Sequence, residues 1–548
     1  MPIGDLRPES STHDTPYRLD LIVGVNGTGK STLLHLLADL FQHLSRSNDS
    51  PPFKFSIIYR LNKDPQHPIT VTITNQTGSL TQRFYLHVED DQQVFLFDGP
   101  SDKIDEKYLP DAIVAFTSGS EGGWLLPSAQ TSVEEDDPTE SPPNINAPDF
   151  GRQLREWYQL EHSQRSEPML VQSIVEQNKN IEDAFLFIQY NQLPLIILCG
   201  LLIDLYIPET IDISPQTSGD TRNHPSSLLN DALKEIKITA LRSFSLKIHL
   251  ISENIAPDDK SLIQRMITMA TYAVKQGNDV LLVFHLYDEH SRRLRQEIIQ
   301  QLVSLQGNAL RFFRWLNQLT IPHDGKEAIL SEVNLFLERD YRTDEEREEK
   351  TLLPPERAPL HMLEWFSDGE VSFLGRLCAL SLLRENEALI LLDEPEVHFN
   401  DYWKRQLVSM LNKFLQDQYS HVIMTTHSSI TLSDVYNTNI WVMKRNGIFT
   451  EYAAPPNLRT LGTDPSDIIV HIFGAESATG AQSISYIQGE IRRIRLLTTT
   501  TQEKIEQLQR LQQNVGPGPL RFLIRREIYA LEDEQNSQPS RNEARLEP

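Results

Sequence analysis

The sequence has few cysteines and no apolar run long enough to cross a bilayer. Only Cys199 and Cys378 occur in 548 residues, which is too few for a disulfide framework, and both lie in apolar surroundings. A reducing, cytoplasmic environment is therefore expected. The first ten residues lack the basic start and apolar stretch of a signal peptide, so none is expected. The most apolar run, 195–207, contains Asp204 and predicts a buried helix, with no membrane span.

Positive charge is also scarce. The chain has 51 Lys and Arg against 76 Asp and Glu, a net charge of −25. This acidity argues against a protein that coats nucleic acid over its whole surface, although a local basic patch or a basic partner stays possible. A hydrophobic content of 39% and 23% charged residues are ordinary for a soluble globular protein. The length favours more than one structural unit.

Strand and helix patterns alternate near both ends of the chain, which predicts an α/β sheet with parallel strands. The expected N-terminal strands are 17–23, 54–61, 69–74, 82–88, 94–98 and 112–116, with a helix at 31–44. Towards the C-terminus we expect helices at 371–384 and 402–416 and strands at 388–392, 421–425 and 439–444. Between them, 153–205 and 261–337 read mostly as helix, with strands at 236–250 and 279–285. Near the C-terminus we expect two more helices, 481–513 and 520–534.

Three segments have the composition of flexible chain. Residues 127–150 are acidic and rich in Pro and Ser, 214–227 form a second break, and 535–548 make a polar tail that we expect to be disordered.

Residues 24–32, GVNGTGKST, match the phosphate-binding P-loop pattern between an expected strand and helix. The glycines let backbone N–H groups surround phosphates at the positive end of the helix. Lys30 is expected to reach the β- and γ-phosphates of ATP, and the Ser31 hydroxyl to bind Mg²⁺. The nucleotide-binding residues expected here are Asn26, Gly27, Thr28, Gly29, Lys30, Ser31 and Thr32.

Two later strands end in residues suited to hydrolysis. Strand 388–392 is followed by Asp393 and Glu394. Asp393 is expected to hold Mg²⁺, and Glu394 to orient and deprotonate the attacking water. Strand 421–425 is followed by His427, which can sense the γ-phosphate. An acidic turn and a structural histidine are the alternatives, and the upstream P-loop argues against both.

The segment 365–370, Trp-Phe-Ser-Asp-Gly-Glu, precedes an expected helix. Here the sequence resembles the ABC ATPase superfamily, in its SMC- and RecF-like branch, whose signature motif usually reads Leu-Ser-Gly-Gly. The resemblance implies that Ser367 and Gly369 contact ATP held by a second chain, and it includes Glu370 in the nucleotide site. Asp368 departs from the usual motif and adds negative charge near a phosphate. A simple helix cap at Ser367 or Asp368 is the alternative.

The motifs follow the order of that superfamily, so the resemblance implies an α/β fold. We expect an ABC-type P-loop ATPase head with a large, mainly helical insertion and a helical C-terminal extension. The expected parts are an N-terminal ATPase lobe (1–126), the acidic segment (127–150), the helical insertion (151–350), a C-terminal ATPase lobe (351–455), a helical partner or oligomer region (456–534) and the tail (535–548). No Gln-loop residue is assigned, and the Gly/Ser-rich loop 117–124 either lines the site or is an ordinary turn.

Several branches of the superfamily fit poorly. The large insertion disfavours transporter subunits, and the lack of sustained heptads disfavours long SMC coiled coils. Asp464 and Asp467 are too widely spaced for the Asp-x-Asp pair of a Toprim nuclease. The remaining architecture resembles the PtuA-type ATPases of Septu and some retron anti-phage systems. That resemblance implies a homodimer or higher oligomer, an HNH nuclease partner (PtuB) and, in retrons, a reverse transcriptase with its RNA–DNA product.

Two other functions stay open at this point. One is a RecF-like DNA repair or recombination ATPase, and the other is a slow ATPase that uses ATP as a structural clamp. The C-terminal helices carry an isoleucine stripe, with Ile487 and Ile494 among its members, beside arginines such as Arg492 and Arg525. This pattern is typical either of a docking surface or of an amphipathic helix with solvated arginines.

Overall fold

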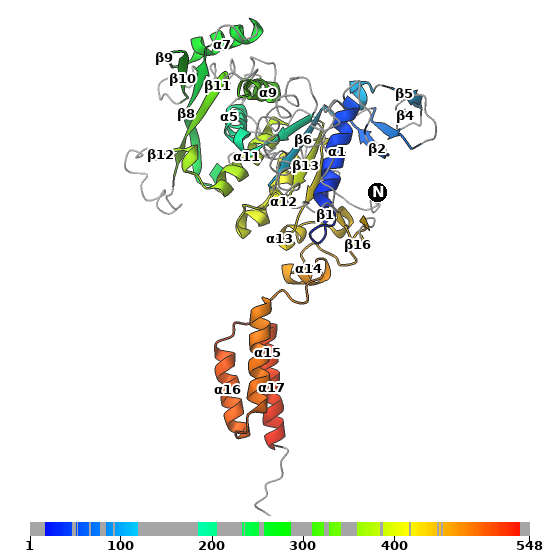
Figure 1. Cartoon of the computed structure of the whole chain (residues 1–548), viewed down its shortest axis with the longest axis vertical. Coiled ribbons are helices and arrows are strands. Elements are labelled where there is room, and N and C mark those ends of the chain that lie inside the picture. Colours follow the sequence, from blue (N-terminus) through cyan, green and yellow to red (C-terminus); the bar gives the residue numbers. More distant parts are fainter. Residues whose placement is uncertain are drawn as a thin grey trace, which may run out of the picture. The chain divides into compact units, whose positions relative to one another are not determined.

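The computed structural model describes residues 17–45, 51, 53–64, 67–76, 84–90, 94–102, 104–118, 185–204, 229, 233–234, 236–250, 257–286, 309–322, 328–340, 359–383, 387–415, 418–446, 449–450 and 453–536. The chain divides into two compact units, Met1–Gly462 and Thr463–Pro548, and each is described by itself (Figure 1). The segments 127–150 and 214–227 lie outside the described residues, as does the tail beyond residue 536. No helix in the described ranges is long and apolar enough to cross a membrane.

A six-stranded parallel sheet forms the centre of the first unit, as predicted. Its strands, in spatial order, are β15 (Ile440–Val442), β1 (Arg18–Val23), β14 (His421–Thr425), β13 (Ala388–Asp393), β6 (Ala112–Thr117) and β7 (Phe185–Ile188). All five neighbouring pairs are parallel. The carboxyl ends of these strands therefore meet at one edge of the sheet, which is where ligands bind in open α/β folds.

Helices cover both faces of this sheet, and the strand period of two decides which residues face which helix. Leu391 and its neighbour Ala115 belong to a core that includes Leu34 of α1 (Lys30–Ser45). Leu392 and Phe116 face the other way, towards α11 (Asp368–Leu382) and α12 (Asp401–Leu415). Because both faces are covered, all six residues of β13 are buried.

A four-stranded antiparallel sheet packs on the same core as α1. It contains β2 (Ser56–Leu61), β3 (Ile69–Thr74), β4 (Phe84–Asp90) and β5 (Phe95–Ser101), close to the predicted bounds. In β4 the buried residues alternate with partly exposed ones, which is the pattern of a sheet with one face on a core.

A second antiparallel sheet is formed by strands between residues 238 and 362, in the order β12–β11–β8–β10–β9. Its strands are β8 (Ile238–His249), β9 (Tyr272–Gln276), β10 (Asp279–His285), β11 (Leu330–Arg339) and β12 (Leu360–Met362). Among the described residues of the range 151–350, the helices are α5 (Leu193–Asp204), α7 (Pro257–Met269) and α9 (Ala309–Leu319).

This sheet corrects the expectation that residues 151–350 are mainly helical, as far as they are described. Strands β8 and β10 were expected, whereas β7, β9 and β11 lie where helix was predicted. In β11 the apolar residues Val333, Leu335 and Leu337 recur at every second position, and Leu335 and Leu337 are buried while Asn334 and Phe336 are less so. That period of two is the strand signal that the helical reading of 261–337 overlooked.

In residues 463–536, the described part of the second unit, three longer helices pack together and a short one precedes them. The helices are α14 (Pro465–His471), α15 (Ala481–Leu496), α16 (Thr501–Gln513) and α17 (Pro519–Asn536). The single helix expected over 481–513 is wrong, because Thr500 caps a new helix by accepting a hydrogen bond from the Glu503 backbone N–H. Four consecutive threonines at this point favour a cap over a continuous helix.

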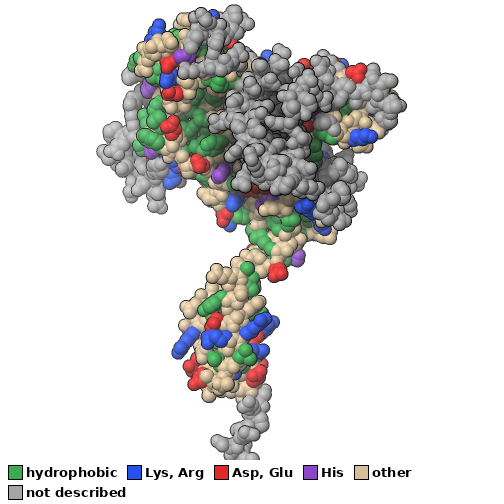
Figure 2. Space-filling view, viewed as in Figure 1, with side chains coloured by type: hydrophobic (Ala, Val, Ile, Leu, Met, Phe, Trp, Pro, Cys, Tyr) green, Lys and Arg blue, Asp and Glu red, His purple; other side chains and the backbone are tan. Residues whose placement is uncertain are grey.

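The isoleucine stripe of α15 is structural, since Ile487 and Ile494 are buried against α16 and α17. Arginines lie outside this core, and Figure 2 shows Lys and Arg side chains on the surface of the unit. Arg493 pairs with Glu490, and Arg495 with Glu527. The amphipathic-helix interpretation thus accounts for the stripe.

The remaining short elements connect the larger ones. They are η1 (Glu106–Tyr108), η3 (Tyr190–Gln192), η4 (Leu363–Trp365), α13 (Ser429–Leu432), η5 (Asn437–Asn439), β16 (Arg445–Asn446) and β17 (Phe449–Thr450).

Candidate nucleotide site

The P-loop joins β1 to α1 at the carboxyl edge of the parallel sheet. Gly24, Gly27 and Gly29 have φ angles of 157°, 79° and 90°, which L side chains rarely adopt. A Cβ on Gly24 would also lie 2.6 Å from the carbonyl oxygen of Met443. The glycines of the motif are therefore required by the backbone path.

The other predicted P-loop residues differ in exposure. Asn26, Gly27 and Thr32 are exposed, whereas Thr28 is buried and donates its hydroxyl to the Val25 carbonyl, 2.9 Å away. Lys30 is buried, and its Nζ donates to the Gly24 carbonyl at 3.3 Å. Burial lowers the pKa of Lys30, while nearby Glu394 and Asp393 counter part of that effect. The loop thus holds a partly desolvated cation beside two carboxylates.

Asp393 is bonded by hydroxyls from three elements. Ser31 Oγ and Thr425 Oγ1 donate to its Oδ1 at 2.9 and 2.6 Å, and Thr117 Oγ1 donates to Oδ2 at 3.3 Å. Thr117 and Thr425 are the register partners of Asp393 on the two neighbouring strands. Thr117 begins the segment 117–124, for which the sequence left open whether it lines the site or forms an ordinary turn. Sequence reasoning missed Thr425, because only the strand order makes it a neighbour of Asp393.

This group of oxygens suits Mg²⁺. The ion prefers oxygen ligands, and it usually takes one or two carboxylates and completes its shell with water and substrate phosphates. Ser31 and Asp393 provide a hydroxyl and a carboxylate in direct contact. In the described ranges no group of three or more His, Cys, Asp or Glu side chains could hold a metal ion by itself. The donor set therefore fits an ion that enters together with ATP.

Glu394 follows Asp393 in a left-handed conformation, with φ of 47°. Such a conformation costs a non-glycine residue about 1 kcal/mol or more. The Glu394 backbone N–H donates to Thr425, at 3.2 Å to the carbonyl and 3.0 Å to the hydroxyl. These bonds hold the turn that presents the carboxylate at the sheet edge.

His427 lies directly opposite that carboxylate. Its Nε2 is 3.2 Å from Glu394 Oε1, and both side chains are about one third exposed, at 32% and 34%. Burial and the charge of Lys30 lower the pKa of His427. They outweigh the nearby carboxylates of Glu394 and Asp393, which act to raise it. The imidazole is therefore largely neutral at neutral pH.

Two buried charged residues near this site were not predicted from the sequence. Glu396 accepts hydrogen bonds from the Thr426 hydroxyl and, at 3.2 Å, from the His427 backbone N–H. Burial raises the pKa of Glu396 despite these bonds. Glu396 thus fixes the backbone that carries His427.

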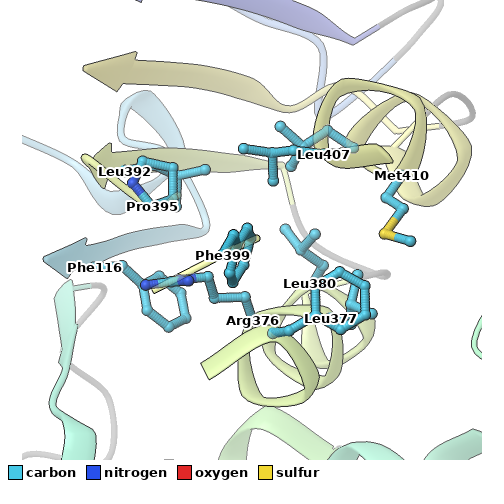
Figure 3. Close-up of a pocket in the computed structure, with 11 residues that line it drawn as sticks. Phe116, Arg376, Leu377, Leu380, Leu392, Pro395, Phe399, Leu407 and Met410 are labelled. Atoms are coloured by element: carbon cyan, nitrogen blue, oxygen red, sulfur yellow. The ribbon is translucent and has the colours of Figure 1, made fainter. Parts of the chain in front are cut away.

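Arg376, on α11, is the second unpredicted residue. Its Nη2 donates to Ser118 Oγ at 2.6 Å, and its guanidinium lies 4.9 Å from the ring centroid of Phe399. Burial lowers the pKa of Arg376 to about 10, against the opposite effect of Glu396. A cavity of about 20 Å³ with otherwise apolar walls adjoins it, and Figure 3 shows Phe116 and Phe399 close to the guanidinium. Arginines are common in helices, so the sequence alone did not indicate that the Arg376 guanidinium is buried.

The signature segment forms a helix start. Ser367 caps α11 by accepting from the Glu370 backbone N–H, and Glu370 accepts from the Ser367 backbone N–H at 2.9 Å. Glu370 also pairs with Arg339. Burial acts to raise the pKa of Glu370, but the bonds from Arg339 and Ser367 together outweigh burial and lower it. A Cβ on Gly369 would lie 2.6 Å from the His398 carbonyl oxygen. Asp368 turns to Tyr190, whose hydroxyl donates to it at 2.9 Å.

The predicted residues thus fall into two groups. Lys30, Ser31, Asp393, Glu394 and His427 come together at one sheet edge. Ser367 and Glu370 bond to each other at the start of α11, and Glu370 also bonds to Arg339. Ser367 therefore caps a helix, as the alternative interpretation predicted. The predicted contact of Ser367 with ATP held by a second chain stays a prediction.

Residues 283–434 match a family model described as "AAA domain, putative AbiEii toxin, Type IV TA system". This range contains the signature segment, Asp393, Glu394 and His427. The match covers these residues alone, so it shows that this section of the chain is similar to that ATPase family. None of the curated proteins matches it.

Solved structures with some likeness are heads of SMC proteins. One is an SMC head with an extended coiled coil, bound to the C-terminal domain of ScpA and derived from Pyrococcus furiosus; it has 10% identity and a TM-score of 0.25 and covers 80% of this chain and 90% of that one. An SMC head bound to the C-terminal winged-helix domain of ScpA has 10% identity, a TM-score of 0.24 and coverages of 80% and 91%. An SMC head with a coiled coil and joint from Pyrococcus yayanosii has 11% identity and a TM-score of 0.24, and the match covers 80% of this chain and 93% of that one. These TM-scores are too low to support an argument about mechanism.

Proposed function

We propose that the chain is a Mg²⁺-dependent ATPase that hydrolyses ATP to ADP and phosphate and completes its site by dimerisation. The observation that carries the proposal is the meeting of Lys30, Ser31, Asp393, Glu394 and His427 at the carboxyl edge of one sheet. Lys30 would bind the phosphates, and Ser31 and Asp393 would hold Mg²⁺. The ion supplies charge stabilisation at the phosphates when it is bound.

Glu394 would act as the base. Its carboxylate is about one third exposed and lies 3.2 Å from His427 Nε2, so a water at the open side of the site can reach it and give up a proton to it. A neutral His427 can donate a hydrogen bond to the γ-phosphate, or to Glu394, as the nucleotide changes. The turn held by Thr425 fixes the direction of the carboxylate before ATP arrives.

The proposed dimer uses the signature face. Exposed apolar and aromatic side chains surround Ser367, with exposed fractions of 66% for Trp365, 49% for Tyr190, 44% for Val397 and 50% for Tyr402. Ser367 forms its hydrogen bonds with Glu370 within the same helix start. A second copy of the chain could bring its bound ATP to this face, and burial of the aromatic side chains would favour the contact.

We further propose that the ATPase cycle controls a separate nuclease in anti-phage defence, as the PtuA-type resemblance implies. The sequence support is a full set of ATPase motifs without a recognisable nuclease site. An HNH protein would be the partner, and in a retron the reverse transcriptase with its RNA–DNA product would join the assembly.

The test is to purify the chain with the products of its neighbouring genes and to measure phosphate release and mass with Mg²⁺ and ATP. We expect turnover by the unmodified chain, a stable ATP-bound dimer for Glu394→Gln, and a co-purifying nuclease. ATP-dependent DNA binding by the chain alone, losing affinity as salt rises, would support a RecF-like ATPase instead. Dimerisation without phosphate release above background would support a structural clamp, and absence of a nuclease would overturn the defence proposal.

A further inference from the structure

A cavity of about 790 Å³ lies in the first unit, away from the P-loop. Its walls come from Gln189 and η3, the start of α5, the end of α9 and the residues after it, and strands β8, β10 and β11 of the antiparallel sheet. Pockets for small molecules usually have volumes of roughly 300–1,000 Å³. The size therefore suits a ligand of nucleoside dimensions.

The polar part of the wall consists largely of amide side chains. Asn191, Gln192 and Asn317 line the cavity, together with the hydroxyl of Thr320. Asn317 is only 2% exposed, and its Oδ1 has no hydrogen-bond partner in the structure. A buried amide oxygen without a partner costs about 1–3 kcal/mol, and a rotation of this side chain that turned its amide towards a ligand would recover this loss. Amides can both donate and accept hydrogen bonds.

The charges at the cavity are already balanced. Lys247 Nζ lies 2.8 Å from Glu332 Oε1 and 3.7 Å from Asp279 Oδ2. Asp279 also bonds to His249, which lines the same wall. Because two carboxylates surround the lysine, the wall offers little net positive charge to a phosphate. A neutral ligand is favoured over an anionic one.

The remaining wall is apolar and includes Leu195, Ile321 and Val333. Apolar surfaces with a few amides suit a flat heteroaromatic ring, whose edge carries both donors and acceptors. Hydroxyls of a sugar could bond to Asp279 or Ser331 at the charged side. From this wall we infer that the cavity binds a free nucleoside.

The cavity is connected to the signature motif by direct contacts. Asn191 and Gln192 directly follow Tyr190, whose hydroxyl donates to Asp368 at the start of α11. The following helix, α5, packs closely on α11. A Cβ on Gly200 would lie 2.4 Å from Cys378 Cβ, and one on Gly375 would lie 2.6 Å from Leu193. Two helices in such contact cannot move independently.

A nucleoside that contacts η3 and α5 would therefore act on the position of Ser367. This second step rests on the proposed function, because it assumes that the signature face takes part in ATP turnover. The nucleoside would then be an effector of the ATPase, bound away from the catalytic residues.

The binding experiment uses calorimetry on the full chain carrying Lys30→Ala, so that the P-loop does not compete for ligand. Adenosine, guanosine, cytidine, uridine and their 5′-monophosphates are the probes. We expect at least one nucleoside to bind with a Kd below about 1 mM, and its monophosphate to bind roughly tenfold more weakly. If no nucleoside binds, or if the monophosphates bind as well as the nucleosides, the inference is wrong.

Asn317→Leu tests the buried amide. We expect it to abolish nucleoside binding while the melting temperature of the free protein stays the same or rises, because the unsatisfied amide is gone. Ala328→Trp, which fills the cavity from another wall, is the second variant should Asn317→Leu not fold. If both variants fold and bind the nucleoside as tightly as the unmodified chain, the nucleoside binds outside this cavity and the inference is wrong.

Tyr190→Phe tests the connection in the otherwise unmodified chain. It keeps the ring and removes the bond to Asp368. We expect the nucleoside to change kcat/KM for ATP by roughly fivefold or more in the unmodified chain, and this effect to be lost in the variant with binding retained. Binding without any effect on turnover overturns the effector role. Binding by a chain that shows no ATP turnover leaves the site standing and overturns the proposed function.

Discussion

The phosphate half of the candidate site, around Lys30 and Asp393, is held together differently from the signature half, around Ser367. In the phosphate half, hydrogen bonds join residues far apart in sequence, such as Ser31 to Asp393 and Thr117 to Asp393. In the signature half, the bonds of Ser367 stay within four residues of the same helix start. One half is preformed by a single chain, and the other presents an exposed face.

The difference has a topological cause. The parallel sheet brings the ends of β1, β6, β13 and β14 to one edge, so their terminal side chains meet whatever their separation in sequence. A helix cap needs only the first turn of its own helix. The two halves should therefore respond differently to substitution, and the following changes test this from the largest effect to the smallest.

The largest effect is expected for Lys30→Ala. Loss of a charged contact to the phosphates worth about 3 kcal/mol should weaken ATP binding by about 100-fold. Binding of a fluorescent ATP analogue measures this effect. Lys413→Ala, at an exposed position in the last turn of α12, is the matched control and should leave affinity unchanged. An affinity within about threefold of the unmodified chain in Lys30→Ala would show that Lys30 is not a phosphate ligand.

Gly369→Ala should affect the signature half alone. The new Cβ would meet the His398 carbonyl, so the start of α11 must shift at a cost of about 1–3 kcal/mol. We expect turnover to fall by about tenfold or more, with ATP affinity nearly unchanged. Parallel loss of ATP affinity would mean that the two halves are not separate.

Gly489→Ala is the control for that change. Gly489 lies within α15, and a Cβ there would have no neighbour within 4 Å. Alanine is the better helix former, so this variant should gain up to about 1 kcal/mol of stability and keep its turnover.

Thr425→Val should have a smaller effect on the phosphate half. It removes the hydroxyl that donates to Asp393 and accepts from the Glu394 backbone N–H. We expect a loss of about 1–3 kcal/mol in unfolding free energy and a higher Mg²⁺ requirement for turnover. Urea denaturation and a Mg²⁺ titration measure the two quantities.

Thr431→Val provides the matched comparison. Thr431 is also fully buried, but its hydroxyl has no hydrogen-bond partner in the structure. Valine should therefore be neutral or stabilising at this position. Equal losses in the two variants would contradict the role assigned to Thr425.

The smallest effect concerns Glu387, outside both halves. Burial raises the pKa of its carboxyl from 4.5 to about 7, although the Asn62 backbone N–H bonds to it. The folded chain then holds a proton that the unfolded chain releases. This stabilisation is complete below pH 4.5 and is lost as pH rises through about 7.

Glu387→Gln should remove this dependence and keep an acceptor for Asn62. We expect the variant to gain roughly 1–2 kcal/mol relative to the unmodified chain between pH 5 and pH 8, after allowance for partial exposure. Melting temperatures across that range measure it. A difference that does not change with pH would mean that Glu387 is ionised throughout.

Local patterns predicted much of the fold. The bounds of β3 and β14 are those expected from the sequence, and the P-loop lies between a strand and a helix. These features depend on residues close together in the chain. The strands β9 and β11 were missed because a short period-two pattern competes with a helical one over the same residues. The break before Thr500 was missed because a capping box interrupts an otherwise helical pattern.

The sequence by itself determined the residue types of the candidate site: a P-loop with Lys30 and Ser31, two acids after a buried strand, and a histidine after another. Their chemistry is local and needs only the right residue at the right strand end. The tertiary structure decided which groups touch them. Thr117, Thr425, Glu396 and Arg376 act through neighbours that only the strand order and helix packing supply. Contacts between distant segments depend on how the sheet is assembled, and no short stretch of sequence contains that information.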